Sequence, residues 1–193
     1  MVKILFIRPN ANETKYTLTI ENGSDTKEYL ICADTYLSLN SPVRDTEISE
    51  RDFLDICFED ECNKAFRKAY ELLSFRDKSR YDLRMKLIHC GFSPDASDSA
   101  IERCIELGYL DEYIQVERAV EREANYKLRG PYHIRRALVG KGYSVSDVDR
   151  AIFNLLKSGE VDFEKSFECL CEKKRAQTEE ERNKLKYRFG YKI

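Results

Sequence analysis

One short sequence design occurs twice in this chain, with a constant offset of 51 residues. The stretch SRYDLRMKLIHCGFS covers residues 79–93, and GPYHIRRALVGKGYS covers residues 130–144. Two copies of one fold need the same residue types at core, capping and joint positions, and the matches fall mostly at such positions. The identical pairs are Tyr81 and Tyr132, Arg84 and Arg135, Leu87 and Leu138, Gly91 and Gly142, Ser93 and Ser144, Asp98 and Asp149, Ala100 and Ala151, and Ile101 and Ile152. The recurrence predicts an array of similar units rather than one irregular globule.

Each copy has the sequence signals of two helices joined at a glycine. Ser79 is a favourable N-cap residue for the first helix, and Ser93-Pro94 is typical of the start of the next one. Gly91 stands between them, where a helix commonly ends with a residue in the left-handed conformation. We therefore expect Gly91 and its counterpart Gly142 to be structural joints with positive φ. A further helix is predicted over residues 61–75, so each unit should contain three helices.

The first part of the chain carries strand signals instead. Apolar and β-branched residues occupy residues 3–7, 15–20 and 27–34, and turn-forming residues separate them. Asn22-Gly23 in the second turn is a strong hairpin signal. We expect a small antiparallel sheet of two or three strands here, followed by an acidic stretch and then by helix from about Ser49.

A third helical segment begins near Asp162 and leads to another joint-like sequence, RFGY at residues 188–191. The sequence ends two residues later, so the last helix of this unit is expected to be missing. The predicted fold class is mainly α, with tandem three-helix repeats forming an elongated curved array and a small N-terminal antiparallel β-sheet. The predicted domains are residues 1–48 (β-rich extension), 49–111 (first repeat with its lead-in), 112–160 (second repeat) and 161–193 (third repeat, incomplete at its C-terminus).

Composition and charge fit a helical protein with a large surface. Of the 193 residues, 42% are hydrophobic and 35% are charged, and the net charge is −2. The charge is uneven, because 6 Lys and Arg stand against 13 Asp and Glu as far as Cys62, whereas 27 stand against 22 from Asn63 onward. No apolar run approaches the roughly 20 residues that cross a bilayer, and the N-terminus lacks the features of a signal peptide. We expect a cytoplasmic monomer without membrane contact.

The sequence carries no motif that indicates catalysis. Phosphate-binding loops, nucleophile elbows and zinc-protease motifs are absent, and the two histidines, His89 and His133, stand at different places in their units. The seven cysteines are odd in number and show no repeated CxxC spacing, which disfavours a disulfide framework or a zinc site. We therefore predict a protein that is not an enzyme and that needs no cofactor or metal.

Basic residues gather around the start of the second helix in both units. A positive helix N-terminus flanked by Arg and Lys attracts phosphates or the carboxylates of a partner. Two of these positions recur under the 51-residue shift, namely Arg76 with Lys127 and Arg84 with Arg135. The competing interpretation is a solvated face held by local ion pairs. The candidate partner-binding or DNA-binding residues are Arg76, Lys78, Arg80, Arg84, Lys127, Arg129, Arg135 and Arg136.

Residues 68–112, KAYELLSFRDKSRYDLRMKLIHCGFSPDASDSAIERCIELGYLDE, resemble the first repeat of the RecX family of recombinase regulators. That repeat has a leucine-rich helix, an Arg-x-x-Ser, an acidic-Leu-x-x-Lys-Leu helix, a glycine-aromatic joint and a Gly-Tyr-Leu/Ile-Asp terminus. The corresponding residues here are Leu72-Leu73, Arg76 to Ser79, Asp82 to Leu87, Gly91-Phe92 and Gly108 to Asp111. Residues 127–144, KLRGPYHIRRALVGKGYS, are similar to the second signature of the family. The third unit departs from the family, because Phe189 stands between Arg188 and Gly190.

The resemblance implies a protein that binds RecA-type recombinase filaments on single-stranded DNA and lies in their helical groove. It also implies that the protein modulates, chiefly by inhibition, the ATPase and strand-exchange activities of these filaments in DNA recombination and repair. Direct contact with single-stranded DNA is left open.

Two other classes of protein remain as alternatives. One is an α-helical repeat adaptor for another protein. The other is a helix-turn-helix-like DNA-binding protein, although the helices after the joints begin with the acidic sequences SPD and SDVD, where a recognition helix would carry Arg or Asn. Retention on recombinase filaments, measured with and without DNA, distinguishes the three classes.

Overall fold

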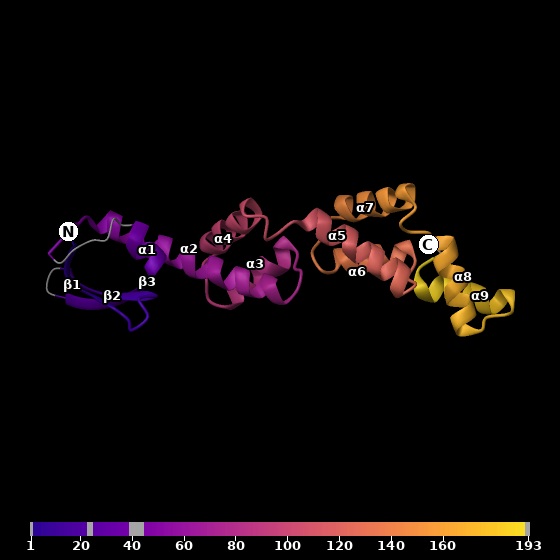
Figure 1. The fold of residues 1–193 in the computed structure, drawn as a ribbon, viewed down its shortest axis with the longest axis horizontal. Helices are drawn as coiled ribbons and strands as arrows, with labels where there is room; N and C mark the ends of the chain where they lie inside the picture. Colours follow the sequence, from indigo (N-terminus) through magenta and orange to yellow (C-terminus); the bar gives the residue numbers. More distant parts are fainter. Residues whose placement is uncertain (1, 23–24, 39–44, 192–193) are drawn as a thin grey trace. The chain divides into compact units, whose positions relative to one another are not determined.

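The computed structural model describes residues 2–22, 25–38 and 45–191, and Figure 1 shows their course. A small sheet comes first along the chain, and helices follow it. This confirms the predicted fold class, a mainly helical chain of three-helix repeats with a small N-terminal antiparallel sheet.

Contacts group the chain into two compact units, which we describe separately. The first runs as far as Phe75 and also contains Arg84–Tyr109. The second contains Arg76–Leu83 and the described residues from Leu110 onward. The repeat boundaries expected after residues 48, 111 and 160 remain a prediction.

The sheet of the first unit has the strand order β3-β2-β1-β4, and each neighbouring pair is antiparallel. Alternation along the strands directs Ile4, Leu18, Ile20 and Ile31 into one buried cluster, where they pack with Phe53 of a long helix. The sheet therefore gains its stability from one covered face. Its strands are β1 (Val2–Pro9), β2 (Lys15–Asn22), β3 (Asp25–Cys32) and β4 (Glu47–Ile48).

Two details of the expected sheet were wrong. A fourth strand, β4, pairs with Val2 and Lys3 of β1, and its two residues lie in a polar stretch that carries no strand signal. The third strand stops at Cys32 rather than at residue 34, because a short helix, α1 (Ala33–Ser38), begins there. In the β2–β3 hairpin Asn22 pairs with Asp25, while Gly23 of the predicted turn lies outside the described residues.

The long helix α2 (Glu50–Phe75) belongs to both the sheet module and the first repeat. It begins after Ser49, whose Oγ accepts a hydrogen bond from Asp52 N at 3.0 Å. The predicted helix over residues 61–75 is therefore only its second half. The first half places Phe53 and Ile56 in the interior, and the second half buries Ala65 and Ala69.

The remaining helices follow the repeat pattern. They are α3 (Arg80–His89), α4 (Pro94–Glu106), α5 (Glu112–Glu121), a π-helical turn η1 (Arg122–Tyr126), α6 (Pro131–Val139), α7 (Val145–Ser158), α8 (Phe163–Lys174) and α9 (Glu179–Phe189). Ser93 and Ser144 cap α4 and α7 in the same way, because each side chain accepts a backbone N–H three residues later. Asp111 and Asp162 likewise cap α5 and α8.

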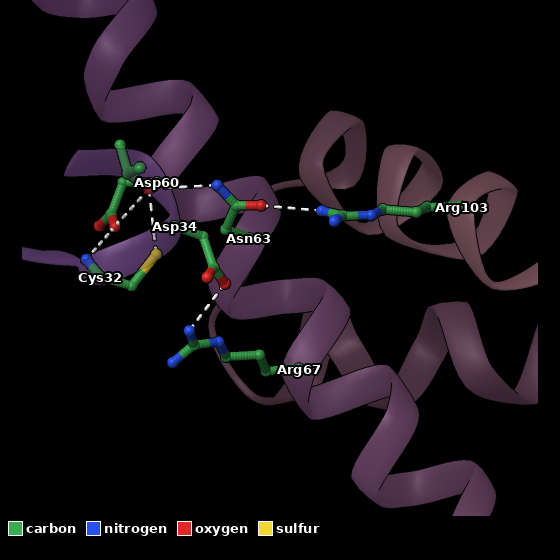
Figure 2. A network of polar contacts seen from close by, with 7 residues as sticks. Cys32, Asp34, Asp60, Asn63, Arg67 and Arg103 are labelled. Atoms are coloured by element: carbon green, nitrogen blue, oxygen red, sulfur yellow. Dashed lines mark hydrogen bonds and ion pairs between the residues drawn. The ribbon is translucent and has the colours of Figure 1, made fainter. Parts of the chain in front are cut away.

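A buried polar network holds α1 against α2, and Figure 2 shows it from close by. Asp60 is 5% exposed and accepts hydrogen bonds from Cys32 N at 2.7 Å and from Thr35 Oγ1 at 3.1 Å. Asn63 continues the network, because its Nδ2 donates to Thr35 Oγ1 and its Oδ1 accepts from Arg103 Nη1 of α4 at 2.9 Å. The network therefore ties the end of the sheet module to the first repeat.

Replacing Asp60 with alanine is expected to destabilise this attachment by about 2 kcal/mol, because a buried backbone N–H and a buried hydroxyl lose their acceptor. Asp34→Ala is the matched control from the same network. Its pair with Arg67 is about half exposed on both sides, so its loss should cost less than about 1 kcal/mol. Amide hydrogen exchange at Cys32 reports the difference: faster exchange in the Asp34 variant than in the Asp60 variant would contradict this assignment.

Candidate partner-binding surface

Arg84 and Arg135 occupy equivalent places in α3 and α6, and each bonds the helix after the joint. Arg84 Nε and Nη2 donate to Asp98 Oδ1 and Oδ2 at 2.6 and 2.9 Å. Arg135 Nε donates to Asp149 Oδ1 at 2.8 Å. All four side chains are between 38% and 51% exposed, so these pairs are solvated and contribute little to stability. A guanidinium has five N–H donors, so each arginine can still bind a second, external anion.

Lys127 and Arg129 lie in a different environment, because both bond a buried carboxylate. Glu123 is 2% exposed, and its two oxygens accept hydrogen bonds from Lys127 Nζ at 2.6 Å and from Arg129 Nη1 at 2.7 Å. Burial alone would raise the pKa of Glu123, but the hydrogen bond from Lys127 and the charges of Arg129, Lys127 and Lys141 outweigh burial and lower it. Their cationic groups therefore neutralise an interior charge as well as reaching solvent.

The other four candidates differ in exposure. Lys78 is 7% exposed, and its Nζ donates to the carbonyl of Arg76 at 3.2 Å, which places it within the segment that precedes α3. Arg76, Arg80 and Arg136 are exposed. The backbone N–H of Arg80 donates to Glu112 Oε1 at 2.7 Å, so the start of α3 is fixed to α5.

Successive repeats meet at their joints. Gly142 has φ +88°, and a Cβ built on it would lie 2.8 Å from Tyr81 Cβ and 2.9 Å from Ser79 Oγ. The Ser79 hydroxyl accepts Asp82 N at the start of its own helix and donates to Lys141 O at 2.6 Å. One serine thus caps α3 and holds the joint of the second repeat.

The same contact recurs one repeat further on. Gly130 is the counterpart of Ser79, and its N–H donates to Phe189 O at 2.7 Å, while Tyr132 N donates to Gly190 O at 3.1 Å. The start of α6 therefore holds the joint of the third repeat, as the start of α3 holds the joint of the second. Gly91, the joint of the first repeat, has φ +95° and a Cβ there would meet nothing within 4 Å. Both positive φ values agree with the left-handed joints expected from the sequence.

A hollow of about 220 Å³ lies beside the first of these junctions. Arg76, Lys78 and Lys141 line it together with Asp77 and Asp82, so its charge is mixed. The structure thus brings two of the candidate residues, Arg76 and Lys78, into one hollow. Arg84 and Arg135 are not among its lining residues.

The sequence does not reveal that the caps and joints of successive repeats contact each other, nor that Lys127 and Arg129 bond Glu123. A usable signal for the junctions is the constant spacing of twelve residues between a helix cap and its joint glycine, as in Ser79 to Gly91 and Gly130 to Gly142. No comparable signal exists for Glu123, because a glutamate four residues before a lysine is typical of an exposed helix face, whereas this carboxylate is buried in the π-helical turn.

Among the described residues, no group of three or more His, Cys, Asp or Glu side chains could hold a metal ion. In the same part of the chain, no helix is long and apolar enough to span a bilayer.

Comparisons with known proteins agree with this architecture. The family model described as RecX, first three-helix domain, matches residues 65–104. A regulatory protein RecX from Chlorobium phaeobacteroides is 33% identical over 107 residues, which cover 55% of this chain and 66% of the relative. The protein of the same name from Lactobacillus johnsonii is 28% identical over 142 residues, covering 73% of this chain and 51% of the relative. The chain thus spans between half and two-thirds of the length of these relatives.

Two solved structures share the fold. A crystal structure of regulatory protein RecX superposes with a TM-score of 0.70 at 20% sequence identity. The superposed residues make up 95% of this chain and 89% of the chain in that structure. The crystal structure of RecX from Lactobacillus salivarius gives a TM-score of 0.57 at 21% sequence identity, over 69% of this chain and 88% of the chain in that structure.

The recurring helices, caps and joints define a tandem three-helix repeat protein, with half-exposed arginines at equivalent places in two repeats. The family match to the first repeat, the named relatives and the shared fold all point to one group within this class. The chain belongs to the RecX family.

Proposed function

We propose that this protein is a non-enzymatic regulator that binds RecA-type recombinase filaments on single-stranded DNA and restrains their ATPase and strand-exchange activities. The observation that carries the proposal is the repeated Arg–Asp pair. Arg84 with Asp98 and Arg135 with Asp149 hold a solvated guanidinium at the same place in two repeats. A filament is itself a repeating partner, and it offers carboxylates and DNA phosphates to such groups.

The two helices that follow the joints support a protein partner rather than sequence-specific DNA reading. Their first turns carry Asp95 in α4 and Asp147 in α7, and carboxylates there repel phosphates. A DNA-recognition helix places donors such as Arg or Asn in this part. The names of the relatives, regulatory protein RecX, favour a regulatory role over a plain adaptor.

The double variant Arg84→Gln with Arg135→Gln is expected to bind the filament about ten-fold or more weakly, because each variant side chain loses a charge-assisted contact. Glutamine is preferable to glutamate, because a carboxylate at either site would face Asp98 or Asp149. If both arginines contact phosphates, the slope of log K against log salt should fall by about 1.4. Fluorescence anisotropy on filaments assembled on labelled DNA measures both quantities.

Two controls accompany this measurement. Lys184→Gln removes an exposed cation of α9, whose side chain is 72% exposed, and should leave binding unchanged. The double variant Asp98→Asn with Asp149→Asn removes the carboxylates that pair with Arg84 and Arg135. Its binding to the filament should be as tight as that of the wild type or tighter. Equal affinity and equal salt slope in the arginine variant would remove these residues from the mechanism.

A further inference from the structure

Two aromatic side chains are largely exposed at the same place in the first and second repeats. Phe75 is 79% exposed, and Tyr126 is 77% exposed. The two residues are separated by the same 51-residue offset that relates the repeats. Each is the last residue of its helical element, Phe75 of α2 and Tyr126 of η1. The exposed rings are therefore part of the repeated design of this chain.

Neither ring is required by the fold. Among the described residues, no aromatic ring or cation packs on Phe75 or Tyr126, whereas Tyr70 of α2 packs edge to face on Tyr109. Phenylalanine and tyrosine are weaker helix formers than alanine, leucine or lysine, so the end of a helix does not select them. A single exposed ring is common on protein surfaces, but two at equivalent positions form a pattern. A partner outside the chain accounts for this pattern.

Cations follow each ring directly. The four-residue link after Phe75 is RDKS and the link after Tyr126 is KLRG, so both have a cation at their first and third places. Residues 126–136 contain four Lys and Arg and no Asp or Glu, although the net charge of the whole chain is −2. Arg76 is exposed, and the side chain of Lys127 is 49% exposed although it bonds Glu123. Each accessible ring thus has a positive group next to it.

An aromatic ring beside a cation is the combination with which proteins hold single-stranded nucleic acid. A base stacks on the ring, and the cation attracts the neighbouring phosphate. Duplex DNA does not fit, because its bases are already stacked on one another and must leave the stack to be reached. A protein partner would have to present the same apolar pocket twice. A single strand offers a base at every nucleotide, so it can supply one to each repeat.

We propose that Phe75 and Tyr126 each stack on a base of single-stranded DNA, while Arg76 and Lys127 bind phosphates beside those bases. The contact does not depend on base sequence, because every base has a π-face. It is also distinct from reading by a recognition helix, since both rings precede the joints and neither lies on α4 or α7. This inference rests on the proposed function, because the strand is the one that the recombinase filament carries, and it adds a direct contact with that strand.

Tryptophan fluorescence can test the contact at each ring, because the chain contains no tryptophan of its own. Phe75→Trp and Tyr126→Trp each place a single reporter at an exposed position, where a larger ring does not disturb the core. Phe153→Trp is the matched control, since Phe153 is 64% exposed on α7 and the equivalent residue of the first repeat is Glu102. Each full-length variant is titrated with oligothymidylate, with an abasic strand of the same length, and with RecA-type recombinase alone.

We expect oligothymidylate to quench the tryptophan at positions 75 and 126 but not at position 153, and the abasic strand to quench none of them. Fluorescence anisotropy of labelled oligothymidylate provides the affinities. The double variant Phe75→Ser with Tyr126→Ser should bind this strand about ten-fold or more weakly. Its slope of log K against log salt should equal that of the wild type, whereas Arg76→Gln should reduce the slope by about 0.7.

No quenching at either position, or equal quenching by the abasic strand, would overturn this inference. A tryptophan response to recombinase alone but not to DNA would also overturn it, because the rings would then contact protein. Retention of the wild-type chain on recombinase filaments is measured in parallel. Retention without quenching refutes the stacking contact alone, whereas quenching by bare DNA without retention on filaments refutes the proposed function alone.

Discussion

Gly142→Ala is expected to lower the free energy of unfolding by about 3 kcal/mol, whereas Gly91→Ala should lower it by only about 1 kcal/mol. The two glycines have nearly the same backbone conformation, with φ of +88° and +95°, so a side chain meets the same left-handed strain at both. They differ in their surroundings. The new methyl group at Gly142 would lie 2.8 Å from Tyr81 Cβ and 2.9 Å from Ser79 Oγ, and at Gly91 it would meet nothing within 4 Å.

Urea denaturation of the two variants measures this difference directly, since each serves as the control of the other. The larger loss at Gly142 should come with faster hydrogen exchange in the segment around Ser79, because that serine would lose its bond to Lys141 O. Equal losses at the two glycines would mean that the junction between the first and second repeats contributes nothing to stability.

Glu123→Ala is expected to cost about 3 kcal/mol, because it removes a buried carboxylate that neutralises Lys127 and Arg129. Lys127 and Arg129 are 49% and 40% exposed, so water can solvate their charges once the carboxylate is gone. The expected loss of stability is therefore at the lower end of the range for breaking a buried ion pair. Thermal and chemical denaturation measure the loss. A loss below about 1 kcal/mol would show that the carboxylate is not a structural element of the second repeat.

The same residue makes stability depend on pH. Because the folded protein lowers the pKa of Glu123, its ionised form favours folding. This contribution is fully present above the unfolded-state pKa of about 4.3 and is lost as the pH falls through the lower folded-state pKa. Wild-type stability should therefore fall more steeply below about pH 5 than that of Glu123→Gln, whose side chain does not titrate. Parallel pH profiles would contradict the lowered pKa.

The repeat pattern and the joints were predictable because they depend on local chemistry. A serine or aspartate that caps a helix, a glycine at positive φ and an apolar stripe are each visible within a few residues. The constant offset between Gly91 and Gly142 then shows that the same unit occurs twice. The positive φ at both glycines follows from the same local reasoning.

Features that depend on distant contacts were not predictable in this way. The strand β4 consists of only two residues, Glu47 and Ile48, which pair with Lys3 and Val2 of β1, more than forty residues earlier in the sequence. The helix α1 follows β3 directly, and its Thr35 is fixed by Asp60 and Asn63 of α2, which lie 25 and 28 residues away. Propensity at residues 33–38 alone does not indicate that helix.

The same distinction between local and distant contacts applies to the candidate basic residues. Their positions in the repeats could be found from the sequence, but their ion pairs could not. Arg76 and Lys127 match under the repeat shift, yet Arg76 is exposed and Lys127 bonds the buried Glu123. The π-helical turn of η1 places Glu123 in the interior, and the corresponding part of α2 shows no such turn. A shared sequence position therefore does not ensure a shared role.

Retention on a recombinase filament tests the central claim most directly. The full chain is mixed with RecA-type recombinase and ATP on single-stranded DNA, with the same DNA alone, and with recombinase alone, and co-sedimentation is measured together with ATP hydrolysis. The account predicts retention on the filament well above that on bare DNA, and a slower ATPase as the protein is added. Equal retention on bare DNA, or saturating retention on the filament with no change in ATP hydrolysis, would contradict it.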